Sequence, residues 1–107
     1  MTVAQFRRMA LGLPRVVESS HMGHPDFRVD GRIFATLAQP GNGIGMVKLL
    51  PEQQKIFLDE APAAFSPASG AWGRNGATMV MLRDAPISLV RDALELAWSA
   101  ITGRLSK

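Results

Sequence analysis

Two histidines three residues apart are the first groups along this chain whose types and spacing could do chemistry. His21 and His24 belong to the run His-Met-Gly-His-Pro, and Asp26 follows closely. Imidazoles and a carboxylate are metal ligands, but a site needs three or four of them and the chain has no cysteine. Gly23 and Pro25 indicate a shaped turn, so we expect structural hydrogen bonds for both histidines. Contact with a ligand, and metal or proton chemistry, are the alternatives.

Four cations could meet an anion if folding brings them together: Arg28, Arg32, Lys48 and Arg74. The first two flank an Asp-Gly pair, which is a strong signal for a tight hairpin turn. Arginines on both sides of a hairpin tip resemble a wing that touches a DNA backbone. The commoner outcome is solvated arginines beside the aspartates of the same turn.

A glycine-flanked tryptophan is the third candidate. The run from Trp72 to Gly76 reads Trp-Gly-Arg-Asn-Gly, and its tryptophan and arginine could stack on and clamp a base or an acidic group. A tryptophan can equally plug its own loop onto the core. We expect the second role for Trp72.

No set of residues predicts catalysis. Ser19 and Ser20 adjoin His21, but neighbours on a strand point to opposite faces, and no nucleophile-elbow pattern occurs. Asp84 precedes a helix and is expected to cap it or to place a charge in its first turn. The glycine-rich run at residues 41–45 lacks the Lys-Ser/Thr pair of a phosphate-binding loop. We therefore expect no cofactor and no metal, and an enzyme is less expected than a binding module.

The composition indicates one ordinary globular domain over residues 1–107, with 47% hydrophobic residues and a net charge of +3. Nine of the twelve cations are arginine, which suits bidentate contact with phosphate or carboxylate. Disulfides are excluded because there is no cysteine. No apolar run approaches the roughly 18 residues that span a bilayer, and no signal peptide is visible. We expect a cytoplasmic protein without membrane association.

The elements that must position these groups follow from hydrophobic spacing and from proline and glycine. Thr2 and Gln5 form a capping-box pattern for a first helix, and Gly103 ends the last one. The expected elements are a helix at 3–12, a possible strand at 16–22, hairpin strands at 27–29 and 33–37, a loop at 39–45, a strand at 44–50, a helix from 51 to 61, an irregular connection at 63–76, a strand at 78–82 and a helix from 86 to 102. This order predicts an α+β fold, an antiparallel sheet with helices on one face.

Alternation along two strands assigns the faces of that sheet. The residues expected to face the helices are Val47, Leu49, Val80 and Leu82. The opposite face then carries Met46, Lys48, Met79, Met81 and Arg83. Such a face is either ordinary amphipathic packing or a surface for an anionic or planar ligand, because methionine is adaptable.

The sequence resembles the MmcQ/YjbR family of small bacterial proteins. The resemblance rests on the chain from His21 to Leu37, on the later run from Trp72 to Gly76, and on a first helix that ends at Leu13-Pro14. The resemblance implies a CyaY-like α+β fold with N- and C-terminal helices on one face of the sheet. It also implies the family's customary DNA-binding label, which rests on a proposed double wing. The matching positions are His21, Gly23, His24, Pro25, Phe27, Arg28, Gly31, Phe34, Lys48, Trp72, Arg74 and Gly76. The loop at residues 41–45 is short and uncharged, so the strand pair that it joins offers only a weak second wing.

Three hypotheses follow from these residues. The first is a DNA-binding module in which Arg28, Arg32, Lys48 and Arg74 contact phosphates. The second is a domain for an anionic small molecule or a protein partner, using the methionine-bearing sheet face and Trp72. The last is an enzyme or metal carrier built on the two histidines of the His-Met-Gly-His-Pro run.

Overall fold

A six-stranded antiparallel sheet with the strand order β1-β2-β3-β4-β6-β5 organises the protein. The computed structural model describes residues 1–104. The strands are β1 Val17–His21, β2 His24–Val29, β3 Arg32–Gln39, β4 Ile44–Lys48, β5 Phe65–Pro67 and β6 Ala77–Met81. The helices are α1 Val3–Leu11, α2 Pro51–Glu60, α3 Gly70–Arg74 and α4 Ile87–Thr102, with short 3-10 turns at Pro40–Asn42 and Leu82–Asp84. The expected α+β fold with an antiparallel sheet is confirmed.

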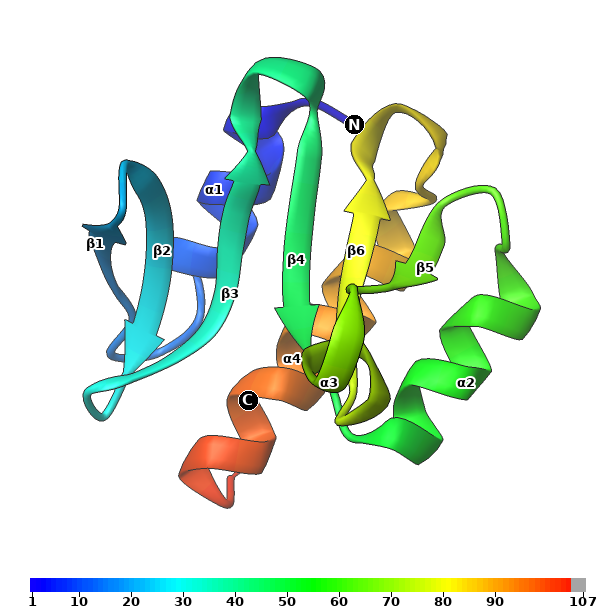
Figure 1. Ribbon diagram of the computed structural model, residues 1–107. Helices are drawn as coiled ribbons and strands as arrows, with labels where there is room; N and C mark the ends of the chain where they lie inside the picture. Colours follow the sequence, from blue (N-terminus) through cyan, green and yellow to red (C-terminus); the bar gives the residue numbers. More distant parts are fainter. Residues whose placement is uncertain (105–107) are drawn as a thin grey trace.

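Helices α1 and α4 cover one face of the sheet, and α3 lies on the other face (Figure 1). The core between the sheet and the two terminal helices contains the four residues expected on that side, Val47, Leu49, Val80 and Leu82, all of them buried. Trp98 of α4 is also buried, and its indole N–H donates a hydrogen bond of 3.0 Å to the Pro14 carbonyl. Among the helices of residues 1–104, none combines the length and apolar character that a bilayer-spanning segment needs.

Local signals explain most element boundaries. The side chain and backbone of Thr2 and Gln5 cap α1 reciprocally, as the sequence predicts. Asp30 and Gly31 both have positive φ, 52° and 78°, which is the geometry of the tight hairpin turn between β2 and β3. Gly103 ends α4 in the left-handed conformation, with φ of 69°.

The segment 63–76 differs from the expected irregular connection, because it contains β5 and the short helix α3. The cause is a contact that no local pattern reveals. Gln54 of α2 is buried, and its Nε2 donates hydrogen bonds of 3.0 Å to the carbonyls of both Gly73 and Ala77. These bonds attach both α3 and the start of β6 to α2.

The expected helix cap at Asp84 is wrong. Pro86 occupies the N-cap position of α4, and no side chain caps the helix there. Asp84 instead lies in the 3-10 turn that precedes α4, where its carboxylate is 3.8 Å from Arg83. The carbonyl of Pro86 accepts hydrogen bonds of 3.1 Å from the N–H groups of Leu89 and Val90, so part of the first turn is satisfied by the backbone without an acidic cap.

A β-bulge shapes the centre of the sheet. The pairs Phe27–Ala35 and Arg28–Ile33 leave Phe34 as the extra residue on β3. Phe34 is buried in the core, while Ile33 lines a pocket on the open face. Because of the bulge, two consecutive apolar residues serve opposite faces: Phe34 packs in the core, and Ile33 stays on the open face.

Candidate functional site

The sheet face that α1 and α4 do not cover contains a pocket of about 630 Å³. Its floor consists of Thr36, Met46 and Met79, which are direct cross-strand neighbours on β3, β4 and β6. Met46 is only 6% exposed, although its side chain points away from the helices. The methionine face is thus a concave surface, with its floor below the surrounding elements.

The polar groups of the pocket lie at its two ends. His21 and His24, which pair across β1 and β2, form one end. Lys48, the last residue of β4, forms the other end with Trp72 of α3. Four of the residues expected at a site therefore line one pocket, although they come from four different elements.

Trp72 does not plug its loop onto the core, so that expectation is wrong. Its side chain is 68% exposed at the edge of the pocket. The packing that fixes α3 comes from the backbone instead, because Gly73 faces Ala68 so closely that a Cβ atom would lie 1.7 Å from the Ala68 carbonyl oxygen. A helix held by its backbone can leave its aromatic side chain free to meet a ligand.

A buried carboxylate orders the histidine end of the pocket. Asp26 is 0% exposed and accepts hydrogen bonds from Arg28 Nε at 2.8 Å and from Arg28 Nη2 at 3.1 Å. Its Oδ2 also lies 2.8 Å from His21 Nδ1. The two hydrogen bonds from the Arg28 guanidinium lower the pKa of the Asp26 carboxyl below its usual value, against the opposing effect of burial. Arg28, Asp26 and His21 therefore form one chain of charge-assisted hydrogen bonds.

The second histidine has a buried nitrogen without a partner. In the part of the chain that the structure describes, His24 Nδ1 is buried and makes no hydrogen bond. Its ring lies 6.4 Å from that of His21, measured between centroids. No group of three metal-ligating side chains occurs within residues 1–104, and both Asp26 oxygens are already occupied. Because this nitrogen is buried, it supplies no ligand atom to the pocket, and His21 carries the accessible imidazole nitrogen at this end.

The four cations expected on DNA do not share one site. Arg28, Arg32 and Lys48 line a second hollow of about 510 Å³, between the β2–β3 turn and the end of α4, which shares Lys48 and Ile33 with the sheet-face pocket. Arg28 is paired with Asp26, whereas Arg32 and Lys48 form no ion pair within residues 1–104. Arg74 lines neither hollow. Among the described residues, two of the four cations, Arg32 and Lys48, therefore converge without an ion-pair partner.

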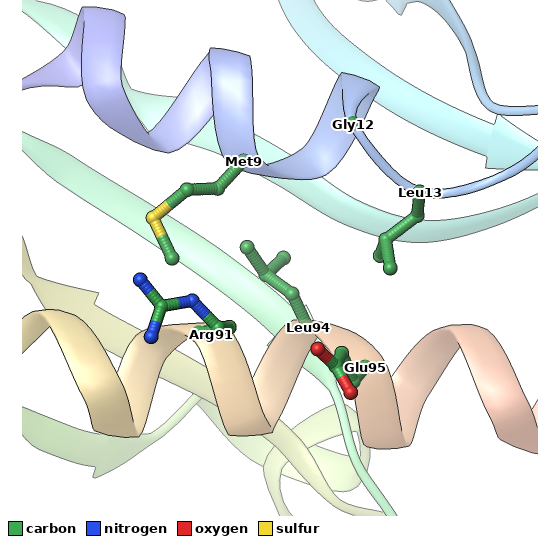
Figure 2. A pocket seen from close by; sticks show the side chains of 6 residues that line it. All are labelled: Met9, Gly12, Leu13, Arg91, Leu94 and Glu95. Carbon is green, nitrogen blue, oxygen red and sulfur yellow. The ribbon is translucent and has the colours of Figure 1, made fainter. Parts of the chain in front are cut away.

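A smaller hollow of about 260 Å³ separates α1 from α4 (Figure 2). Met9 and Arg91 extend toward each other across it, and Glu95 follows one turn further along α4. None of the candidate site residues that the sequence singles out lines this hollow. It is a packing groove between two helices and a weaker candidate than the sheet-face pocket.

Similarity to known proteins identifies the family. The YjbR family model matches residues 11–100. The chain belongs to the YjbR family. A similar solved structure is that of the Deinococcus radiodurans protein DR2400, a DUF419 domain, with a TM-score of 0.78 and 18% identity over 96% of this chain and 80% of that chain. At this identity the likeness concerns the fold alone, and among curated proteins no sequence matches significantly.

Two residues organise the site of this YjbR-family protein in ways that sequence reasoning did not anticipate: Asp26, considered only as a possible metal ligand, and Gln54. Asp26 alternates with His24 and Arg28 along β2, so the period of two places all three on one face. That alternation was a usable signal for the buried network. Gln54 gave no such signal, because an amide on an exposed-looking helix is ordinary until its partners 19 and 23 residues away are known.

Proposed function

We propose that this YjbR-family domain binds a small anionic molecule with an aromatic or apolar body in the sheet-face pocket. The observation that carries the proposal is the convergence of His21, His24, Lys48 and Trp72 on one pocket with a methionine floor. Ligand pockets are commonly about 300–1,000 Å³, apolar, and equipped with a few polar groups. The volume and the lining both fit that description.

Each part of the pocket contributes a definite interaction. The exposed indole of Trp72 offers a stacking surface, and aromatic stacking of this kind contributes about 1–3 kcal/mol per ring. The thioethers of Met46 and Met79 adapt to rings of different shape. Lys48, which pairs with no carboxylate among the described residues, supplies the positive charge for an anionic group.

Titration with 2-naphthoate, a two-ring carboxylate, tests the proposal. We expect saturable binding by calorimetry, with an affinity about 10-fold weaker or more in Trp72→Ala, because the stacking surface is lost. Lys48→Met should also weaken binding, since the stem is kept and the charge removed. Lys55→Met is the control, because Lys55 is an exposed residue of α2 that does not line the pocket. Equal affinities in all three variants, or no saturable binding, would contradict the proposal.

A second candidate function is contact with a DNA backbone, which the hollow lined by Arg28, Arg32 and Lys48 supports. Because Arg28 is already paired with Asp26, two cations remain for phosphates. The logarithm of the affinity should then fall with the logarithm of the salt concentration with a slope of about −2, at roughly −0.9 per phosphate.

Fluorescence anisotropy with a labelled duplex measures that slope. We expect Arg32→Ala to reduce it by about 1 and Trp72→Ala to leave it unchanged, which separates this function from the first. No binding at about 50 mM salt would remove the DNA hypothesis for this chain.

A further inference from the structure

The sheet-face pocket is elongated, with different chemistry at each end. His24 lies two residues before Asp26 on β2, and Lys48 lies two residues after Met46 on β4. Asp26, Thr36 and Met46 are paired in one cross-strand row, so the histidine and the lysine lie on opposite sides of that row. With about 4.8 Å between strands and 3.4 Å per residue, their backbones are roughly 17 Å apart. The side chains of the histidines and Lys48 project into the pocket from its ends and shorten this gap, so a single ligand that reaches both ends carries one functional group at each end.

At the histidine end, one ring nitrogen of His21 is hydrogen-bonded to Asp26, and the other is available to a ligand. Nδ1 lies 2.8 Å from the Asp26 carboxylate, which can only accept a hydrogen bond. The proton of a neutral imidazole is therefore held on Nδ1, and the lone pair is left on Nε2. His21 lines the pocket, so this ring carries the acceptor at that end.

The arrangement resembles the way in which proteins fix a histidine that must act through one particular nitrogen. A carboxylate behind the ring sets its tautomer and its orientation, and a further partner holds the carboxylate. Here Arg28 fixes Asp26 through two hydrogen bonds of 2.8 and 3.1 Å. The Nδ1 of His24, near the same end, is buried beyond the reach of a ligand, so Nε2 of His21 is the acceptor that this end of the pocket presents.

We propose that the ligand of this pocket carries a hydroxyl or N–H group that donates a hydrogen bond to His21 Nε2, at the end opposite to its anionic group. The ligand class is therefore an elongated aromatic or apolar acid with a distal hydrogen-bond donor. The inference rests on the proposed small-molecule function and specifies its ligand. His21 acts as a binding residue in it, and Asp26 and Arg28 act as positioning residues.

Three naphthoates test the inference: 2-naphthoate, 6-hydroxy-2-naphthoate and 6-methoxy-2-naphthoate, each titrated by calorimetry at pH 7.5. We expect the hydroxy compound to bind about 10-fold more tightly than the parent compound, 2-naphthoate, because its hydroxyl can donate a hydrogen bond to His21 Nε2. The methoxy compound has no donor and should bind no better than the parent. In His21→Phe, which keeps a ring, the hydroxy and parent compounds should bind equally.

The outcomes separate this inference from the function on which it rests. Equal binding of the hydroxy and parent compounds to the wild type, with the Trp72→Ala effect intact, overturns the donor and leaves the small-molecule function standing. A preference that persists in His21→Phe also overturns the inference. If no naphthoate binds, both proposals are overturned together. Because Asp26→Asn can weaken the fold, the His21→Phe result decides the matter, and Asp26→Asn adds only whether the carboxylate sets the preference.

Discussion

Replacing Gly76 by alanine is expected to remove a large part of the stability of this protein. Gly76 has φ of +111°, and an added Cβ would lie 1.9 Å from the carbonyl oxygen of Leu49. Backbone strain and overpacking each cost about 1–3 kcal/mol. Because a domain of this size has about 5–15 kcal/mol of stability in total, we expect a loss of roughly 4 kcal/mol or more. Urea denaturation followed by circular dichroism measures it as a lower midpoint.

Gly41→Ala is the matched control for this substitution. Gly41 is an exposed glycine without a positive φ, and an added Cβ there meets nothing within 4 Å. We expect its midpoint to stay close to that of the wild type. Identical midpoints for the Gly76 and Gly41 variants would show that the contact between the start of β6 and the end of β4 is looser than the structure has it.

Asp26→Asn is the second substitution with a large expected effect. The buried carboxylate accepts hydrogen bonds from Arg28 and faces His21, and an amide cannot replace the charge that holds the guanidinium. We expect the free energy of unfolding to fall by about 2–3 kcal/mol at pH 7. This is no more than the smallest loss typical of a broken, fully buried ion pair, because Arg28 is partly exposed. Asp92→Asn, at an exposed position of α4, should change stability by no more than about 0.5 kcal/mol.

The same carboxylate makes stability depend on acid pH, with a definite sign. The folded-state pKa of Asp26 is lowered, so its contribution is fully present above the unfolded-state value of about 3.9. It is lost as pH falls from there through the lower folded-state value. The difference in unfolding free energy between wild type and Asp26→Asn should therefore shrink below about pH 4. A difference that stays constant from pH 7 to pH 3 would contradict the assigned role of Asp26.

Gly76 and Asp26 position the side chains at the two ends of the candidate site. Gly76 and Gly73 allow the backbone contacts that hold α3, and α3 carries Trp72. Asp26 holds the imidazole of His21. The glycines in the Trp-Gly-Arg-Asn-Gly run are thus explained by close backbone approach, and its tryptophan by exposure at the pocket.

The sequence predicted most of the residues that form the candidate site. It did not predict how those residues are arranged in space. His21, His24, Lys48 and Trp72 were all singled out by type and spacing, and they line one pocket. Arg74 was singled out by the same reasoning and lies outside it. Residue type tells which side chains can meet an anion or a ring, but the distance between them depends on strand order.

The sequence by itself determined the local structure of this protein: the capped first helix, the Asp-Gly hairpin, the helix after Pro51 and the Val/Leu face of the sheet. Each depends on interactions within a few residues, or on a period of two or 3.6, so it can be read along the chain. Only the tertiary structure decided that α3 forms, that Trp72 is exposed, and that Asp26 pairs with Arg28 and not with solvent. Those outcomes depend on which segments distant in the chain exclude water from one another, and a buried amide or carboxylate must then take the partner that the packing brings to it.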